Sequence, residues 1–487
     1  MLLIDKPTQL NRQKMKLETI EELKREINSY EMVALLKACY NYFDIEIEKP
    51  KALWVTLTIM KWTYLYGTRT KPVKPLTVKA FQTLFEAIME FDPDHISNYM
   101  KSQGIHRAFA ILHYQQFYLQ TAVHKERFST QLKFYEILES RYDISASFKK
   151  KTGLSITEFL RILQCMWLYA QMKQSEFPNT KITGYVSQPI LDSMSEIFGK
   201  IQTERFINLL MITPLTAAKE AKKWKGTNAT KYEMMEHSFL TLFPFQWFEN
   251  SVRIVHPSVF NYTANYYIYD YMKINDPKFT TEFGARFEKY IQLGLDEINI
   301  NYKIESEVKR SLPAKHKVVD FVIDDNILLE CKAIEPKPLA SINPTDDYVY
   351  SSYKDSLLKA YYDQMLPVSK FLNPNQENWG IVITHKNIFW SDYRELYQFT
   401  KDRYANSADN SQLPPENVFI MDIHTWDLVI NVIVTGQTTL PDLLKKARNA
   451  NANHLTRKAQ FDMQLDDFDL RQFQLSYLAK ETELLKL

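Results

Sequence analysis

The stretch Lys317–Pro336, KVVDFVIDDNILLECKAIEP, constrains this chain more than any other part of it. Two runs rich in β-branched and aliphatic residues, Val318–Ile323 and Ile327–Ile334, flank the polar trio at positions 324–326. Apolar runs separated by a few turn-forming residues are typical of two antiparallel strands joined by a tight loop. We therefore predict a β-hairpin over this stretch.

The length of the loop decides which side chains face each other across the hairpin. With a three-residue loop, Asp320 falls opposite Glu330, and their Cβ atoms would lie about 5 Å apart on one face. Lys332 shares that face because side chains alternate along a strand. A two-residue turn would instead put Glu330 opposite Phe321, so the prediction depends on the register.

Asp320, Glu330 and Lys332 would share a face with apolar neighbours. These neighbours are Val318, Val322, Leu328 and Ile334. Facing carboxylates repel each other, and burial further disfavours their charged form. A hard divalent cation removes both penalties, and Mg²⁺ typically takes one or two carboxylates, waters and phosphate oxygens. The pattern favours metal-assisted phosphodiester hydrolysis, with Lys332 placed to orient or help deprotonate the attacking water.

A structural interpretation competes with the catalytic one. Glu-x-Lys on one strand face is also a common surface ion pair, so the tripeptide alone is a weak motif. The hairpin context, with Asp320 opposite Glu330 among apolar residues, is what favours catalysis. Cys331 faces away from the pair, and we interpret it as a small buried hydrophobe.

The order of these residues resembles the PD-(D/E)xK nuclease superfamily, which includes restriction enzymes and many defence nucleases. Its core has a helix carrying Glu, a strand carrying Asp, a strand carrying Glu-x-Lys and often a later helix carrying Gln. The matching segments here are the helix Phe283–Leu295 with Glu288, the hairpin, and Tyr361–Gln364. The resemblance covers about Thr280 to Val434, and Val319 stands where the family usually has Pro.

The resemblance implies an active site and a cofactor. The catalytic residues that it implicates are Asp320, Glu330, Lys332, Glu288 and Gln364. Mg²⁺ or Mn²⁺ would be bound by Asp320 and Glu330 with the backbone carbonyl of Cys331, and Glu288 would hold a second metal ion or a metal-bound water. The implied substrate is nucleic acid. DNA is favoured, while RNA, including transfer RNA, stays open.

Another acidic segment precedes the hairpin. Tyr302–Lys309 alternates between polar and less polar positions, which predicts a half-exposed strand. Glu305 and Glu307 on it are rival metal ligands, but we rank them lower because their strand face is wholly polar. A first core helix is predicted at Thr280–Ile298.

The rest of the chain divides into a helical part and a mixed part. Apolar residues recur at helical spacing from Leu17 to about Lys173. Buried strands are predicted at Trp379–Thr384 and Asn417–Asp422, with a helix between them. We therefore expect an α+β or α/β protein: a large all-helical N-terminal region, then a restriction-endonuclease-like core with a mixed sheet, then a helical tail. The predicted bounds are 1–240 for the helical region, 241–276 for a connecting segment, 277–435 for the core and 436–487 for the tail.

Composition limits the function classes. The net charge of the 487 residues is only +2, so nucleic acid would have to bind local basic patches rather than a globally basic surface. Ten glycines suit a mostly helical chain. Three scattered cysteines without CxxC spacing argue against a disulfide framework and a zinc site. No apolar run has the length of a signal or membrane segment, and we expect a soluble cytoplasmic protein.

These observations favour a metal-dependent endonuclease acting in host defence. The helical N-terminal region would sense a phage protein or position the substrate. A dimer would allow both strands of a duplex to be cut, although no coiled-coil heptad indicates one. The alternative is a non-catalytic scaffold that binds nucleic acid or protein and retains a nuclease-like core. Intact Asp320, Glu330 and Lys332 speak against it, and a helical partner-binding regulator is a third possibility.

Overall fold

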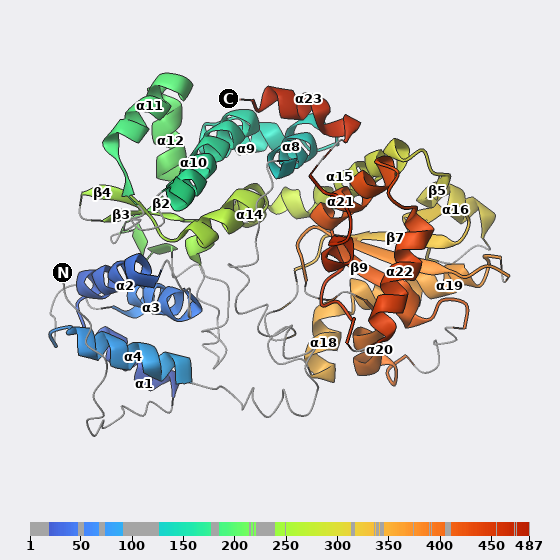
Figure 1. Ribbon diagram of the computed structural model, residues 1–487, viewed down its shortest axis with the longest axis horizontal. Coiled ribbons are helices and arrows are strands. Elements are labelled where there is room, and N and C mark those ends of the chain that lie inside the picture. Colours follow the sequence, from blue (N-terminus) through green and yellow to red (C-terminus); the bar gives the residue numbers. More distant parts are fainter. Residues whose placement is uncertain are drawn as a thin grey trace. The chain divides into compact units, whose positions relative to one another are not determined.

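The structure is a computed structural model (Figure 1). It describes residues 19–46, 53–67, 74–90, 126–176, 185–213, 216–217, 219–220, 239–248, 250–312, 317–335, 337, 340, 345–373, 375–388, 390, 392–404, 411–453, 455–471, 473 and 475–486. Helices predominate, and two mixed sheets complete the structure, so the expected α+β class is confirmed. None of the helices in these ranges is long and apolar enough to cross a membrane.

The chain forms two compact units. One comprises Met1–Asn98, Met172–Ser187 and Leu210–Pro257, and the other comprises Tyr99–Gln171, Gln188–Leu209 and Ser258–Leu487. The predicted helical region 1–240 therefore contributes to both units. The predicted core and tail lie in the second.

The first unit combines helices with a small sheet. Its helices are α1 (Ile20–Asn28), α2 (Met32–Glu46), α3 (Leu53–Tyr66), α4 (Val78–Glu90) and the 3₁₀ turn η3 (Phe239–Thr241). Its strands, in sheet order, are β1 (Tyr185–Val186), β4 (Ser251–Ile254), β3 (Phe245–Phe248) and β2 (Met211–Ile212). The N-terminal region is therefore not all-helical as predicted. Strands of two to four residues are too short to show a period of two, so their pairing with distant segments decides them.

The second unit begins with a largely helical part. Its elements are α8 (Glu126–Leu132), η1 (Lys133–Ile137), α9 (Ile144–Thr152), α10 (Ile156–Glu176), α11 (Gln188–Phe198), α12 (Lys200–Leu210) and α14 (Pro257–Asn275). Helix α15 (Pro277–Glu297) follows, close to the predicted Thr280–Ile298. The Asp276 side chain accepts a hydrogen bond from the Lys278 amide, 3.1 Å, and Pro277 opens the helix. Proline suits that position because the first helical amides have no partner within the helix.

The second sheet contains the predicted hairpin. Its strand order is β5 (Tyr302–Ile304), β6 (Phe321–Ile323), β7 (Ile327–Lys332), β8 (Trp379–Thr384) and β9 (Val418–Asp422). Strands β5, β6 and β7 are antiparallel, whereas β7, β8 and β9 are parallel. Every residue of β8 and β9 is buried, which explains their uniformly apolar character. Both buried strands were predicted from that character.

The hairpin has the predicted register. Ile323 pairs with Ile327, so three residues form the loop. Asp324 and Asp325 have φ angles of 45° and 59°, the left-handed region that Asp tolerates better than most residues. The Asn326 amide donates to the Ile323 carbonyl, 3.1 Å, and closes the turn. The alternative two-residue turn is excluded.

The strand predicted at Tyr302–Lys309 is only partly correct. Strand β5 ends at Ile304, and helix α16 (Glu305–Ser311) replaces the rest. Glu307 accepts a hydrogen bond from the Ile304 amide, 3.0 Å, and Glu305 pairs with Lys309 one turn later, 2.5 Å. These local contacts stabilise the first turn of a helix, and polar alternation by itself does not distinguish them from a strand.

Helices cover both faces of the second sheet. Helix α15 contacts β7, and α21 (Ile423–Val434) contacts β8 and β9. The two helices approach closely at Gly294, where an added Cβ would lie 2.8 Å from Trp426 Nε1. The remaining elements are α18 (Asp346–Tyr353), η4 (Lys359–Met365), α19 (Leu366–Ser369), α20 (Arg394–Thr400), η5 (Pro415–Asn417), α22 (Leu440–Ala452), η6 (Asp462–Leu465) and α23 (Ser476–Leu484). Figure 1 shows α18, α19 and α20 on the side of the sheet opposite α15 and α21.

Candidate functional site

The two predicted hairpin carboxylates lie beside each other. Asp320 directly precedes β6, and the register places it opposite Glu330 on β7. The Cys331 amide donates to Asp320 Oδ2, 2.7 Å, and the Asp320 amide donates to Glu330 Oε2, 3.2 Å. Each carboxylate is thus held by a backbone amide of the other segment. Glu330 is only 1% exposed.

Lys332 and Gln364 complete the contacts of Glu330. The Lys332 ammonium forms an ion pair with Glu330 Oε1. The Gln364 amide nitrogen, on η4, donates to the same oxygen, 2.6 Å, and to the Val318 carbonyl, 3.0 Å. Because both partners accept, the orientation of the amide is determined. Its Oε1 atom is buried and receives no hydrogen bond from the described residues.

Glu288 faces the same group from helix α15. Its side chain is half-buried, and burial raises the pKa of its carboxyl to about 7, with a further contribution from nearby Asp320. Lys332 acts in the opposite direction. Within the described chain no hydrogen bond joins Glu288 to the hairpin. Among the described residues, Glu288 therefore lies in electrostatic range of Asp320 and Lys332 without a hydrogen bond or ion pair to them.

Burial also dominates the electrostatics of the hairpin carboxylates. Burial and, to a lesser extent, the charge of Asp320 raise the pKa of Glu330 to about 7, although the Lys332 ammonium and the Gln364 amide oppose the shift. Burial likewise raises the pKa of Asp320, against the opposing effects of the Cys331 amide and Lys332. One lysine therefore does not offset the cost of holding these acids charged. A bound cation would offset that cost.

The structure adds Glu305 to this group. Ile304 pairs with Phe321 at the end of β5, and the next residue, Glu305, begins α16 close enough to Asp320 to act on it electrostatically. Glu305 raises the pKa of both Asp320 and Glu288. We ranked Glu305 low because its predicted strand face is wholly polar, but the strand ends at Ile304 and the pairing of β5 with β6 brings Glu305 near Asp320. Glu307 accepts a hydrogen bond from the Ile304 amide at the start of α16 and is not part of this group of carboxylates.

The donor atoms of the site fit a hard divalent cation. Two carboxylates, the Cys331 carbonyl and the unpaired Gln364 Oε1 are all oxygen donors, the type that Mg²⁺ and Mn²⁺ prefer. In the described ranges, no group of three or more Asp, Glu, His or Cys side chains is placed to hold a metal ion. Mg²⁺ usually binds one or two carboxylates and several waters, so the residues present suit that mode.

The carboxylate pKa values predict a pH dependence of stability in the absence of metal. Glu330 titrates near 7 in the folded chain and near its ordinary value of 4.5 when unfolded. The folded chain therefore binds more protons between these values, and stability is lost as pH rises through about 7. In chelator, the thermal midpoint is expected to fall between pH 5 and pH 8, and Mn²⁺ at pH 8 to raise it. Thermal denaturation followed by circular dichroism measures both, and a midpoint indifferent to Mn²⁺ would contradict the site.

No family model, no curated protein and no solved structure matches the chain.

Proposed function

We propose that this chain is a divalent-metal-dependent nuclease that hydrolyses phosphodiester bonds of nucleic acid. The observation that carries the proposal is the contact of Glu330 with Asp320, Lys332 and Gln364 at 1% exposure. Such a concentration of charge in a buried sheet costs stability, and metal-dependent catalysis explains its presence. The order of Glu288, Asp320 and the Glu-x-Lys triplet along the chain supports a PD-(D/E)xK-like core.

The division of labour among the residues follows from their contacts. Asp320, Glu330 and the Cys331 carbonyl would hold Mg²⁺ or Mn²⁺. When bound, the ion would polarise the phosphate and lower the pKa of water. Gln364 keeps Glu330 oriented, since its amide is fixed by two acceptors.

Lys332 and Glu288 would act on the water and the phosphate. Lys332 orients the attacking water and offsets the charge that develops on the phosphate. Glu288, with a pKa of about 7, is suited to accept the proton that the water loses. The water oxygen forms a new bond to phosphorus, the bond to the departing sugar oxygen breaks, and that oxygen takes a proton from solvent.

The substrate and the biological setting are also part of the proposal. We favour DNA over RNA, and a role in host defence in which a phage protein triggers cutting. The organisation of the chain supports a trigger, because the chain has a separate compact unit, the first unit, besides the second unit that holds the site. A defence effector would protect cells from phage and lose that protection with the catalytic lysine.

Lys332→Ala is expected to lower cleavage by on the order of 10²-fold to 10³-fold, because the transition-state charge loses its nearby cation. Binding of Mn²⁺ should persist, since both carboxylates remain. The test is cleavage of plasmid DNA and of total cellular RNA with Mg²⁺, Mn²⁺ or chelator, beside Mn²⁺ titration. Lys370→Ala, at an exposed position, is the matched control. Equal cleavage by the two variants would contradict the assigned role, and the substrate that is cut identifies the nucleic acid.

A further inference from the structure

Basic side chains from four helices gather around the end of α9 and the junction of α14 and α15, and we call them the basic patch. Its members, all exposed, are Lys149, Lys150, Lys151, Arg205, Lys273 and Lys278. Lys151, in the last turn of α9, donates to the Asn275 carbonyl at the end of α14, 2.7 Å. Arg205 on α12 donates to the carbonyl of Gly153, directly after α9, 2.8 Å. These two contacts bring the four helices together.

Acidic side chains balance only part of the patch. Asp276 lies 3.9 Å from Lys151, and Glu335 contacts Lys273. Among the described residues, the other four cations pair with no carboxylate, even at the start of α15, where Glu282 follows the patch lysine by one turn. The whole chain has a net charge of only +2, so four cations without a paired acid in one place are a strong local asymmetry.

Helix stabilisation explains only some of these charges. A cation in the last turn of a helix interacts favourably with the helix dipole, which accounts for the lysines of α9 and for Lys273 on α14. Lys278 lies in the first turn of α15, where the same dipole disfavours a cation. Its charge therefore does not stabilise its own helix, and an external anion is the simpler explanation.

An ion-pair network ties the patch to the strand that carries the candidate nuclease site. Glu335 lies three residues after Lys332, the last residue of β7, and one of its oxygens pairs with Lys273 of the patch. The other oxygen pairs with Lys386, just after β8, 2.6 Å, and Lys386 also pairs with Asp270 on α14, 2.5 Å. The α14 end of the patch is thus attached to the segment that directly follows Lys332.

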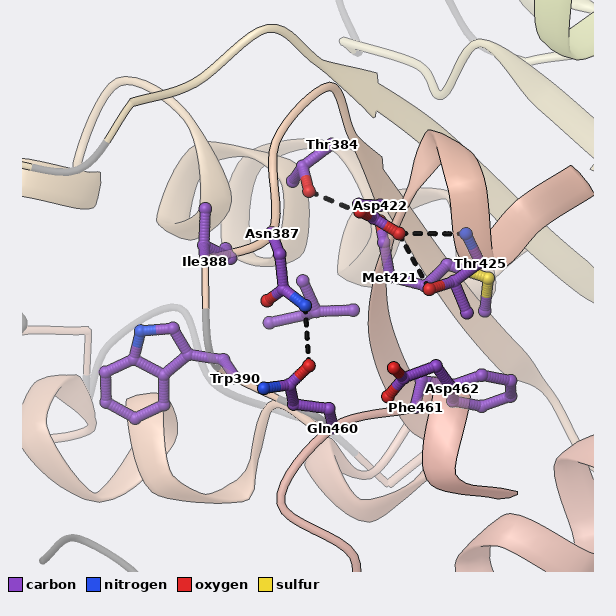
Figure 2. Close-up of a pocket in the computed structure, with 11 residues that line it drawn as sticks. Thr384, Asn387, Ile388, Trp390, Met421, Asp422, Thr425, Gln460, Phe461 and Asp462 are labelled. Atoms are coloured by element: carbon purple, nitrogen blue, oxygen red, sulfur yellow. Dashed lines mark hydrogen bonds between the residues drawn. The ribbon is translucent and has the colours of Figure 1, made fainter. Parts of the chain in front are cut away.

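Further contacts fix the segment that carries Lys386. The Thr384 hydroxyl donates to the Lys386 carbonyl, 2.7 Å, and the Asn387 amide nitrogen donates to the Gln460 amide oxygen, 2.7 Å. Figure 2 shows Thr384 and the contact of Asn387 with Gln460. Because the chain is held on both sides of Lys386, its ammonium gives firm support to Glu335 and, through that carboxylate, to Lys273.

We propose that the phosphodiester backbone of a nucleic acid binds across the basic patch. Lys278 precedes Glu288 by ten residues on α15, about 15 Å at the helical rise of about 1.5 Å per residue. Phosphates of one DNA strand follow each other about every 3.4 Å along the axis, so about four of them span that distance. A strand bound on the patch therefore reaches the hairpin carboxylates. The choice of partner rests on the proposed function, because the neighbouring site is proposed to cut nucleic acid.

Binding of a fluorescently labelled DNA duplex and of a labelled single-stranded RNA tests this surface. The full chain is measured in chelator, so that cleavage does not interfere, over a series of salt concentrations. A variant that combines Lys149→Gln, Lys150→Gln and Lys278→Gln is expected to bind its preferred probe at least about 10-fold more weakly. Its affinity should also depend less on salt, since each phosphate contact contributes about 0.9 to the slope of log affinity against log salt for duplex DNA.

A second triple variant is the matched control. It combines Lys370→Gln, Lys401→Gln and Lys480→Gln, which remove the same charge at exposed positions elsewhere in the second unit. Its affinity and salt dependence should stay close to those of the wild type. Equal binding by the two triple variants, or binding of neither probe by the wild type, would overturn the surface.

Cleavage in Mn²⁺ separates this surface from the nuclease proposal. The patch variant is expected to show a KM raised about 10-fold and an unchanged kcat, because it loses binding and keeps its catalytic residues. A chain that binds through the patch but cuts neither nucleic acid would support the surface and refute the nuclease. Cutting by the patch variant with an unchanged KM would refute the surface and leave the nuclease proposal intact.

Discussion

Glu330→Gln is expected to abolish metal-dependent cleavage, with a loss of on the order of 10³-fold or more. The amide keeps the size of the side chain, but it removes the charge that Lys332 pairs with and one of the two metal-binding carboxylates. Affinity for Mn²⁺ should fall by more than about 10-fold, since losing even an outer partner of a metal site costs about 10-fold to 100-fold. Cleavage assays and Mn²⁺ titration calorimetry measure the two losses.

The structure also fixes the sign of the stability change in this variant. Glu330 is buried and raised in pKa, so the metal-free protein at pH 8 carries an unfavourable charge that Gln lacks. Loss of activity should therefore occur without loss of folding in chelator. Glu416→Gln, on η5 away from the site, is the matched control. Cleavage within about 10-fold of wild type would show that Glu330 is not a ligand and would remove the main support for the nuclease proposal.

Arg286→Met is expected to destabilise the second unit by about 3 to 5 kcal/mol, because it removes several hydrogen bonds from a charged donor and leaves their buried acceptors unpaired. Arg286 lies on α15, two residues before Glu288, and is 3% exposed. Its guanidinium donates to the carbonyls of Phe134 and Tyr135, 2.9 and 3.0 Å, and to the Ser140 hydroxyl, 2.7 Å. Methionine fills similar space but leaves these acceptors unsatisfied. Urea denaturation measures the free energy of unfolding.

Lys289→Met on the same helix is the matched control for this loss. Lys289 makes one hydrogen bond, to the Glu139 carbonyl at 2.9 Å, and is exposed, so its replacement should cost less than about 1 kcal/mol. Similar losses in both variants would show that Arg286 is not specifically required. A difference of the expected size would establish that η1 and the turn after it hold the helix that carries Glu288.

The sequence by itself determined the centre of the candidate site. A short polar loop between two apolar runs is a local signal, and the register of a hairpin follows from loop length and side-chain alternation. Asp320 and Glu330 are therefore opposite each other as predicted, with Lys332 in contact. The uniformly apolar strands β8 and β9 were also recognisable, because burial on both faces removes polar residues. Gln364 came from the resemblance, and the fold places it on Glu330.

The tertiary structure decided what depends on pairing between distant segments. Glu305 lies near Asp320 only because β5 pairs with β6. Helix α16 begins at Glu305 through local contacts of its own. Lys151 meets Lys273 and Lys278 at one junction although the two segments are distant in the chain. Strands β1 to β4 are too short for their side chains to show the period of two that identifies a strand in a sequence. Local hydrogen bonds and the alternation of side chains depend on residues that are neighbours in the sequence. Pairing between distant strands depends on the packing of the whole unit.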